Sequence, residues 1–235
     1  MTGLPTHLLE ENSHSIRLPE YREKLKRWGK DNLRSFPWRE TCDPYRVLLA
    51  EFMLIRTQAK QVAPVYLEFV DRFPTLADAA DASPEEIQDI LSPLGLSWRA
   101  DRVYETLQKL QNRGKGIPQD KKSLLSLPGV SQYVAGAVRC FAFGKPDPLI
   151  DANTVRIAGR IFGLEIKSSS RRNSTFRSLI GEMTDSEDPR LYNLSMLDLG
   201  AKICTSHSPS CRECPLAEMC SYGQETLDQK KGRED

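Results

Sequence analysis

The stretch that most constrains the fold is residues 123–163, in which two apolar segments flank one tight turn. A short leucine-rich segment ends at Leu127 and is followed directly by Pro128-Gly129. Pro disfavours helix at the residue before it and Gly tolerates positive φ, so this dipeptide predicts a break between two helices. The second helix is predicted from about Ser131 to Phe143, with Gly144 as its C-terminal stop. Such a turn directs backbone N–H groups and a helix N-terminus at one spot, which can bind a phosphate.

The rest of the chain predicts helices, with no period-two strand of any length and no internal repeat. Asp43 and Asp151 are each placed to cap a helix, and Ser83 opens a capping box. The fold class is therefore all-α. Further helices are predicted at 21–33, 45–57, 61–73, 83–90, 100–112, 151–160 and 192–203.

Length and composition describe an ordinary globular protein of one large domain or two small ones. The chain has 235 residues, of which 39% are hydrophobic and 28% charged. Because it has neither an apolar run long enough to cross a bilayer nor a signal pattern, we expect an intracellular protein, cytoplasmic or nucleoid-associated. The net charge is only +1, but Lys and Arg gather in residues 17–39 and 99–122. These runs either form a basic face for nucleic acid or are solvated helix faces.

Four of the six cysteines form a compact group near the C-terminus. They are spaced Cys204-x6-Cys211-x2-Cys214-x5-Cys220, whereas Cys42 and Cys140 stand alone. Zinc ribbons use two Cys-x2-Cys knuckles and this group has one, while four thiolates on one loop suit a 4Fe–4S cluster. We therefore expect one 4Fe–4S cluster, with structural zinc as the alternative. Disulfides do not fit the expected intracellular location.

Glu51 is the only acid in a helix that is apolar nearly all round, residues 45–57. A helix of that kind is buried. A buried carboxylate must be paired, protonated or used, because burying an isolated charge is expensive. Glu51 is therefore either a structural residue that binds a neighbouring group or a functional one.

Several motifs together resemble the endonuclease III superfamily of helix-hairpin-helix DNA glycosylases. They are the hairpin Leu127-Pro-Gly-Val130 with Asp151 after it, the pattern Glu51-x-Met-Leu-x-x-Thr57, and the cysteine spacing. The resemblance runs from Phe36 to Cys220. It implies a two-lobed fold with a helical barrel domain, 44–148, which contains the hairpin. It also implies an iron–sulfur cluster domain, 17–43 plus 149–223, and we expect flexible tails at 1–16 and 224–235.

The resemblance also implies roles for individual residues. The hairpin, Leu127, Gly129, Val130, Ser131 and Gln132, would bind DNA. Asp151 would stabilise the oxocarbenium-like sugar that forms as an N-glycosidic bond breaks, unless it is only a helix cap. Glu51 fits the general acid of the adenine-specific members. The cleft between the lobes would hold Glu51, Tyr133 and Asp151, and the target base would leave the stack to reach them.

The substrate depends on Tyr133, Arg56 and Thr57. Relatives that also cleave the strand carry a Lys where this chain has Tyr133, and a phenol cannot form a Schiff base. Adenine-specific members have two Gln where this chain has Ile55-Arg56, and Arg-Thr there is similar to the thymine mismatch glycosylases. Arg56 would enter the duplex or bond to the orphaned base. The alternatives are that Arg56 is a surface ion-pair residue and Tyr133 a packing residue.

The predicted function is a monofunctional DNA glycosylase, without lyase activity, that removes thymine or uracil mispaired with guanine. The expected partner is double-stranded DNA with a mismatched or damaged base, bound by a monomer, with no membrane involved. One alternative is an adenine glycosylase acting opposite guanine or 8-oxoguanine, although adenine-specific members typically carry an extra C-terminal domain and this chain ends soon after Cys220. The other is a catalytically silent protein that binds damaged DNA. Glu51 and Asp151 argue against this second alternative.

Overall fold

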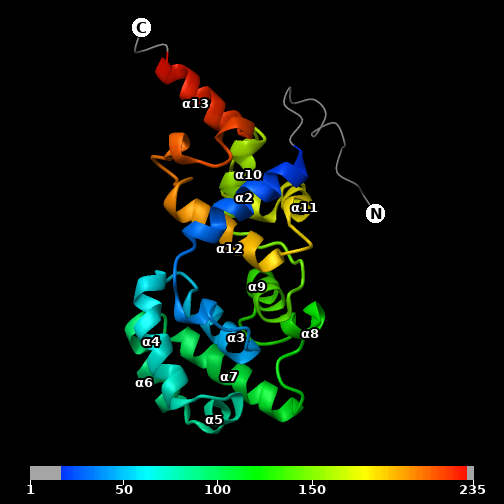
Figure 1. Cartoon of the computed structure of the whole chain (residues 1–235). Coiled ribbons are helices and arrows are strands. Elements are labelled where there is room, and N and C mark those ends of the chain that lie inside the picture. Colours follow the sequence, from blue (N-terminus) through cyan, green and yellow to red (C-terminus); the bar gives the residue numbers. More distant parts are fainter. Residues whose placement is uncertain (1–16, 232–235) are drawn as a thin grey trace. The chain divides into compact units, whose positions relative to one another are not determined.

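A computed structural model describes residues 17–231, and within this range the chain is helical and contains no β-strand (Figure 1). The all-α prediction is therefore confirmed. None of the helices in the described range is long and apolar enough to cross a membrane. The α-helices are α2 (Leu18–Asn32), α3 (Pro44–Met53), α4 (Ala59–Arg72), α5 (Leu76–Asp81), α6 (Pro84–Leu91), α7 (Trp98–Arg113), α8 (Lys121–Leu125), α9 (Gln132–Phe143), α10 (Ala152–Ile161), α11 (Ser174–Met183), α12 (Pro189–Lys202) and α13 (Ser221–Lys231), with short 3-10 turns η1 (Pro37–Arg39), η2 (Ser92–Leu94), η3 (Ser170–Arg172), η4 (Cys211–Glu213) and η5 (Ala217–Met219).

The chain divides into two compact units. Residues 35–145 form the first, which we call the hairpin unit. The second, the cysteine unit, combines residues 17–34 with residues 146–231. The division falls at residue 34, earlier than the predicted barrel start at 44, because the 3-10 turn at 37–39 packs into the hairpin unit. There the Trp38 ring meets the Tyr66 ring edge-on, with 5.5 Å between centroids.

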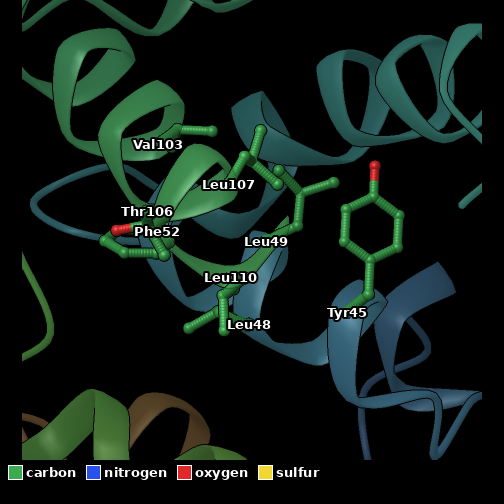
Figure 2. Close-up of a pocket in the computed structure, with 8 residues that line it drawn as sticks. All are labelled: Tyr45, Leu48, Leu49, Phe52, Val103, Thr106, Leu107 and Leu110. Atoms are coloured by element: carbon green, nitrogen blue, oxygen red, sulfur yellow. The ribbon is translucent and has the colours of Figure 1, made fainter. Parts of the chain in front are cut away.

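Helix α3 is the central element of the hairpin unit. Asp43 caps it, since its Oδ1 accepts a hydrogen bond from the Arg46 N–H at 2.8 Å. Eight of its ten residues are buried, and it packs against α7 and α9. Figure 2 shows the contact with α7, where apolar side chains surround a small pocket with the Thr106 hydroxyl at its edge. The contact between α3 and α7 supports the hairpin on its buried side. The pocket is lined by Tyr45, Leu48, Leu49, Phe52, Val103, Thr106, Leu107 and Leu110.

The predicted helix 45–57 is wrong at its C-terminal end, because α3 stops at Met53. Residues 54–57 instead form a turn in which Arg56 adopts a left-handed conformation, φ 56°. The cause lies outside the segment: the Arg99 side chain, from the start of α7, binds the Ile55 carbonyl and the Thr57 hydroxyl. Helix propensity within residues 54–57 carries no trace of that contact.

The predicted hairpin is confirmed in detail. Helix α8 ends at Leu125, and α9 begins after Ser131, whose Oγ accepts the Val134 N–H at 3.2 Å. Gly144 ends α9 in the left-handed conformation, as predicted. Gly129 has φ 72°, and a Cβ there would lie 3.1 Å from both the Arg102 Cβ and the Phe52 ring. Glycine is therefore required at this turn both by its conformation and by the close approach of α3 and α7.

The core of the cysteine unit is formed by α2, α10, α11 and α12. The Tyr21 and Tyr192 hydroxyls lie 3.1 Å apart inside it. Burial of the Tyr192 side chain, more than any other factor, keeps the pKa of this phenol well above its ordinary value. Helices α10 and α12 approach each other closely at Gly200, where a Cβ would stand 2.6 Å from the Asn153 Cβ. A side chain at position 200 would therefore displace Asn153.

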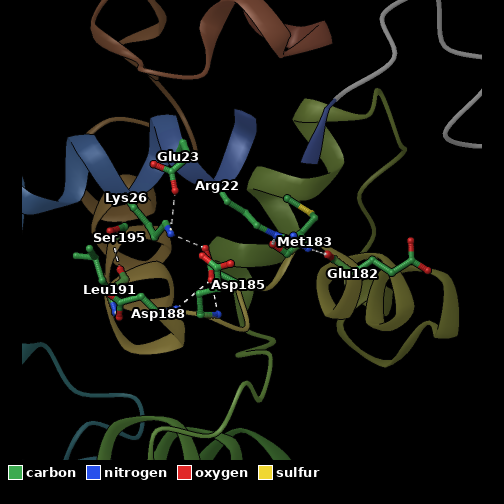
Figure 3. Close-up of polar contacts among 10 residues, drawn as sticks. Arg22, Glu23, Lys26, Glu182, Met183, Asp185, Asp188, Leu191 and Ser195 are labelled. Carbon is green, nitrogen blue, oxygen red and sulfur yellow. Dashed lines mark hydrogen bonds and ion pairs between the residues drawn. The ribbon is translucent and has the colours of Figure 1, made fainter. Parts of the chain in front are cut away.

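A polar cluster around Lys26 and Asp185 lies beside this core (Figure 3). The Lys26 ammonium lies 2.8 Å from the Asp185 carboxylate, whose side chain is 5% exposed. Burial alone would raise the pKa of Asp185. The hydrogen bond from Lys26 and those from the Asp188 and Glu187 N–H groups outweigh it and hold this pKa below its ordinary value.

Residues 224–231, expected to be part of a flexible tail, are helical and continue α13. The helix is anchored at its start, where the Gln224 N–H donates to the Cys220 carbonyl at 2.9 Å and the Ser221 hydroxyl donates to the Ile161 carbonyl at 3.0 Å. The polar composition of residues 224–231 gives no sign of these contacts. The other predicted tail residues, 1–16 and 232–235, lie outside the described residues.

Candidate functional site

The hairpin exposes some of the predicted DNA-binding residues and buries others. Gly129, Ser131 and Gln132 are exposed, whereas Leu127 is 3% exposed and Val130 8% exposed. Leu127 and Val130 therefore anchor the turn through their side chains, and any DNA contact they make comes from their backbone. What the hairpin offers to solvent is the N-terminus of α9 and an exposed glycine, a combination that suits a phosphate oxygen.

Side chains of α7 fix the hairpin backbone from behind. The Thr106 hydroxyl donates to the Pro128 carbonyl at 2.8 Å, and the Lys109 ammonium donates to the Ser126 carbonyl at 2.6 Å. Both bonds are accepted by backbone carbonyl groups. The direction of the hairpin N–H groups is therefore set by the conformation of the turn. These two bonds fix the backbone on both sides of Leu127.

Glu51 and Tyr133 lie on helices that pack against each other, α3 and α9. Glu51 is 5% exposed, as the apolar pattern around it predicted. Tyr133 is half-buried in the first turn of α9. The carboxylate can therefore act only on a group that enters the hairpin unit, whereas the phenol reaches its surface.

Asp151 forms a capping box at the start of α10. Its Oδ1 accepts the Thr154 N–H at 2.8 Å, and the Thr154 hydroxyl accepts the Asp151 N–H at 2.9 Å. Its second oxygen, Oδ2, accepts a hydrogen bond from Asn153 Nδ2 at 2.9 Å. The carboxylate is half-buried and fixed at both oxygens. The helix cap predicted from the sequence is confirmed, and a fixed carboxylate at this place is also suited to stabilise a nearby cation.

Arg156 connects this carboxylate to the cysteine loop. One end of its guanidinium donates to Asn153 Oδ1 and to the Gly200 carbonyl, each at 2.8 Å. Its Nε donates to the Cys204 carbonyl at 2.8 Å. Because Asn153 in turn donates to Asp151, the orientation of the carboxylate depends on the backbone that carries the first cysteine of the group.

The four grouped cysteines line one cavity of the cysteine unit, together with Arg160 and Tyr222. None of them forms a disulfide. Burial, with neighbouring thiols adding to it, raises the pKa of Cys214 to about 12 and that of Cys220 to about 11. Arg160 stacks over the Tyr222 ring at 4.6 Å and donates to Cys204 Sγ at 3.3 Å.

The four thiols share one cavity, a donor set of the kind that can hold a 4Fe–4S cluster. Within residues 17–231, no group of three or more His, Cys, Asp or Glu side chains is arranged as a site for a metal ion. A cube of four irons would give each thiolate its own iron. Two sulfurs also accept hydrogen bonds of the kind that such thiolates need. Arg160 donates to Cys204 Sγ, and the Gly223 N–H donates to Cys220 Sγ at 3.4 Å.

The predicted residues divide between the two units. Glu51, Arg56, Thr57, Tyr133 and the hairpin belong to the hairpin unit, while Asp151 and the four cysteines belong to the cysteine unit. The cleft predicted to unite Glu51, Tyr133 and Asp151 stays a prediction.

Four side chains hold these elements in place without being predicted from the sequence: Arg99, Asn153, Arg156 and Arg160. The three arginines contact backbone or sulfur far away in the chain, whereas Asn153 bonds to the nearby side chains of Asp151 and Arg156. Only the spacing of Asn153 and Arg156 after Asp151, on one face of a capped helix, was a signal that could have found these contacts.

The turn after α3 lies beside the start of α7, where the chain exposes aromatic and apolar surface. Arg56 is exposed, and Leu96 and Trp98 are 36% and 40% exposed. Leu96 also has a positive φ, 62°. The bonds from Arg99 to Ile55 and Thr57 join these two segments, so the exposed Arg56 and Trp98 belong to adjoining segments of the hairpin unit. A charged surface with exposed aromatic groups is suited to nucleic acid.

Residues 17–231 are helical, with a hairpin between α8 and α9 and with buried or fixed carboxylates at Glu51 and Asp151, which are the features of a helix-hairpin-helix DNA repair protein. Residues 49–181 match the family model of the HhH-GPD superfamily base excision DNA repair proteins. The chain belongs to this superfamily, and the resemblance seen in its motifs is confirmed.

Curated relatives match most of the chain. A thymine/uracil-DNA glycosylase of Pyrobaculum aerophilum is 41% identical over 214 residues, which cover 87% of this chain and 92% of the relative. A thymine-DNA glycosylase of Aeropyrum pernix is 38% identical, with 88% and 95% covered. An adenine DNA glycosylase of Homo sapiens is 31% identical, and the match covers 87% of this chain but 39% of that longer protein.

Solved structures agree with the fold. The structure of a thermostable thymine-DNA glycosylase superposes with a TM-score of 0.81 at 31% identity, covering 88% of this chain and 97% of the other. A trapped covalent intermediate of endonuclease III with DNA gives a TM-score of 0.72 at 21% identity, covering 90% and 99%. At that identity the second match supports the fold alone.

Proposed function

We propose that this protein is a monofunctional DNA glycosylase that hydrolyses the N-glycosidic bond of thymine or uracil mispaired with guanine. The observation that carries the proposal is the match to thymine/uracil-DNA glycosylases along nearly the whole of both chains. Arg56, Thr57 and Tyr133 agree with that substrate class. The enzyme would act on double-stranded DNA as an intracellular monomer.

The described residues support a division of labour. The exposed N-terminus of α9 would bind a backbone phosphate, with Gly129, Ser131 and Gln132 at the contact. The flipped base would enter beside Glu51, whose buried carboxyl can exchange a proton with it. The Asp151 carboxylate, fixed at both oxygens, would stabilise positive charge that develops on the sugar.

Tyr133 supports hydrolysis without strand cleavage, because a phenol offers no amine to attack the sugar. Lys145 is the competing nucleophile near this part of the chain, since it is exposed and lies six residues before Asp151. The test is incubation of the wild type with a T·G duplex in the presence of borohydride. We expect free thymine, an intact abasic strand that breaks only in hot alkali, and no trapped adduct. An adduct that disappears in Lys145→Ala would contradict the monofunctional assignment.

The cysteine loop would hold one 4Fe–4S cluster through Cys204, Cys211, Cys214 and Cys220. Such a cluster would be a rigid, charged centre that cross-links the loop through four metal–sulfur bonds. The loop lies next to Arg156 and Arg160. The purified protein should be brown, absorb broadly near about 400 nm and contain about four irons per chain. A colourless, active preparation with one zinc per chain would rule the cluster out.

The second candidate function is adenine removal opposite guanine or 8-oxoguanine. It is favoured by the 31% identity to an adenine glycosylase and by buried Glu51, which fits the general acid of that branch. Release of adenine from an A·8-oxoguanine duplex, with no thymine released from T·G, would select it. Tight binding to both duplexes without release of either base would select the silent damage binder.

A further inference from the structure

Arg99 is the largest of the fully buried side chains in the described range, with an exposed fraction of 0%. Its Nη2 donates to the Ile55 carbonyl at 2.6 Å and to the Thr57 hydroxyl at 2.8 Å. Its Nε and Nη1 are buried and make no hydrogen bond within the described residues. Burial lowers the pKa of the guanidinium. The side chain thus contacts one short turn on either side of Arg56.

Stability does not explain an arginine here. A buried guanidinium with N–H groups that lack acceptors is costly, and an apolar side chain of similar length would fill the same space at lower cost. What the arginine adds is two directed bonds to residues 55 and 57. Between them, Arg56 has φ 56°, a conformation that a non-glycine residue rarely adopts unless its surroundings impose it.

We propose that Arg99 is a positioning residue that clamps the turn at residues 54–58 and thereby fixes Arg56 and Thr57 for recognition of the base opposite the excised one. This inference rests on the proposed function. The clamp would hold the two side chains in place before DNA arrives, so that contacts to the opposite base cost little further ordering. A loose turn would still bind DNA but would distinguish opposite bases poorly.

The test compares Arg99→Met with Arg99→Lys and with a matched control, Arg113→Met, which changes an exposed arginine at the other end of α7. Single-turnover excision of thymine is measured opposite guanine and opposite adenine, beside melting and duplex affinity. For Arg99→Met we expect a rate loss of about 10²-fold opposite guanine and a fall of about tenfold in the guanine preference. The melting temperature should equal or exceed that of the control, because the buried guanidinium is replaced by an apolar side chain, and duplex affinity should match the control. Arg99→Lys, which keeps a donor, should recover part of both.

Hydrogen exchange of the peptide that spans residues 54–58 tests the clamp without any catalysis. Exchange there should be faster in Arg99→Met than in the wild type, and unchanged in Arg113→Met. If the wild type excises no base, the proposed function fails while this measurement still decides the clamp. Unchanged exchange, or a rate and a preference equal to those of the control, would overturn the inference.

Thr57→Val is the second route, for the case in which Arg99→Met does not fold. The substitution removes one acceptor of the clamp and keeps the shape of the side chain. It should speed exchange at 54–58 and lower the guanine preference in the same direction. Where Arg99→Met does fold, Thr57→Val should have a smaller effect in the Arg99→Met background than in the wild type, because both changes break one contact. Wild-type exchange and preference in Thr57→Val would refute the clamp.

Discussion

Replacing Asp151 separates its two possible roles, because the structure gives each role a different signature. In its role as a helix cap, Asp151 accepts a hydrogen bond from the Thr154 N–H through Oδ1. In its role as a charged group, it presents a carboxylate whose Oδ2 accepts a hydrogen bond from Asn153. Asp151→Asn keeps the cap, since Asn caps as well as Asp. It places an amide NH₂ opposite Asn153 Nδ2 and so loses one hydrogen bond, which costs about 1 kcal/mol. Asp151→Ala loses the cap as well, about 1 kcal/mol more.

These costs predict small changes in stability beside a large change in rate. For a chain of this length, a loss of about 1 kcal/mol in the free energy of unfolding lowers the melting temperature by about 2–4 °C. Asp151→Asn should therefore melt slightly below the wild type, and Asp151→Ala clearly below it. Loss of one preorganised charge in the transition state costs about 10²–10³ in rate. Both variants should therefore lose turnover to a similar extent although their stabilities differ, and both should still bind the duplex.

The assay is single-turnover thymine release from a T·G duplex with enzyme in excess, beside thermal melting of each variant. Asp188→Asn is the matched control, because Asp188 caps α12 through the Leu191 N–H at 3.0 Å and has no place in the proposed site. It should leave the rate unchanged. A rate for Asp151→Asn close to that of the wild type would refute the electrostatic role and leave Asp151 as a cap.

Three further predictions concern other residues. Tyr133→Lys places an amine in the first turn of α9 and should gain some strand cleavage and a borohydride-trapped adduct; a variant with neither would remove Tyr133 from the sugar's surroundings. Asp185→Asn should lower the free energy of unfolding at pH 7, and its difference from the wild type should shrink as the pH falls below about 4, because stabilisation by a carboxylate with a lowered pKa is lost on protonation. A difference in urea melts that stays constant from pH 7 to pH 3 would contradict this. Gly200→Ala should lower both the melting temperature and the rate, since its Cβ would push Asn153 away; a normal rate in a destabilised variant would show that Asn153 does not orient Asp151.

The sequence predicted those parts of the fold that local patterns encode. Helix caps at Asp43, Ser83 and Asp151 and the stop at Gly144 all depend on residues within a few positions of each other, and the structure confirms them. Helix α5 was too short, at six residues, to give a periodic signal.

Side chains that act over long chain distances were beyond the sequence. The end of α3 is set by Arg99, which is 42 residues from its partner Thr57. The orientation of Asp151 depends on Arg156 and on the backbone at Cys204, 48 residues away from Arg156. Motif resemblance identified Asp151 and the cysteines singly, but it gave no sign of the chain of hydrogen bonds that joins them.

The most direct test of the proposed activity is a comparison of single-turnover rates on four duplexes that differ in one base pair: T·G, U·G, A·G and A·8-oxoguanine. With labelled strands and hot alkali to reveal abasic sites, the proposal predicts cleavage at thymine and uracil opposite guanine, with adenine removed at least about 10²-fold more slowly from either partner, a ratio that corresponds to about 2.7 kcal/mol in transition-state binding. Faster removal of adenine opposite 8-oxoguanine than of thymine opposite guanine would contradict it.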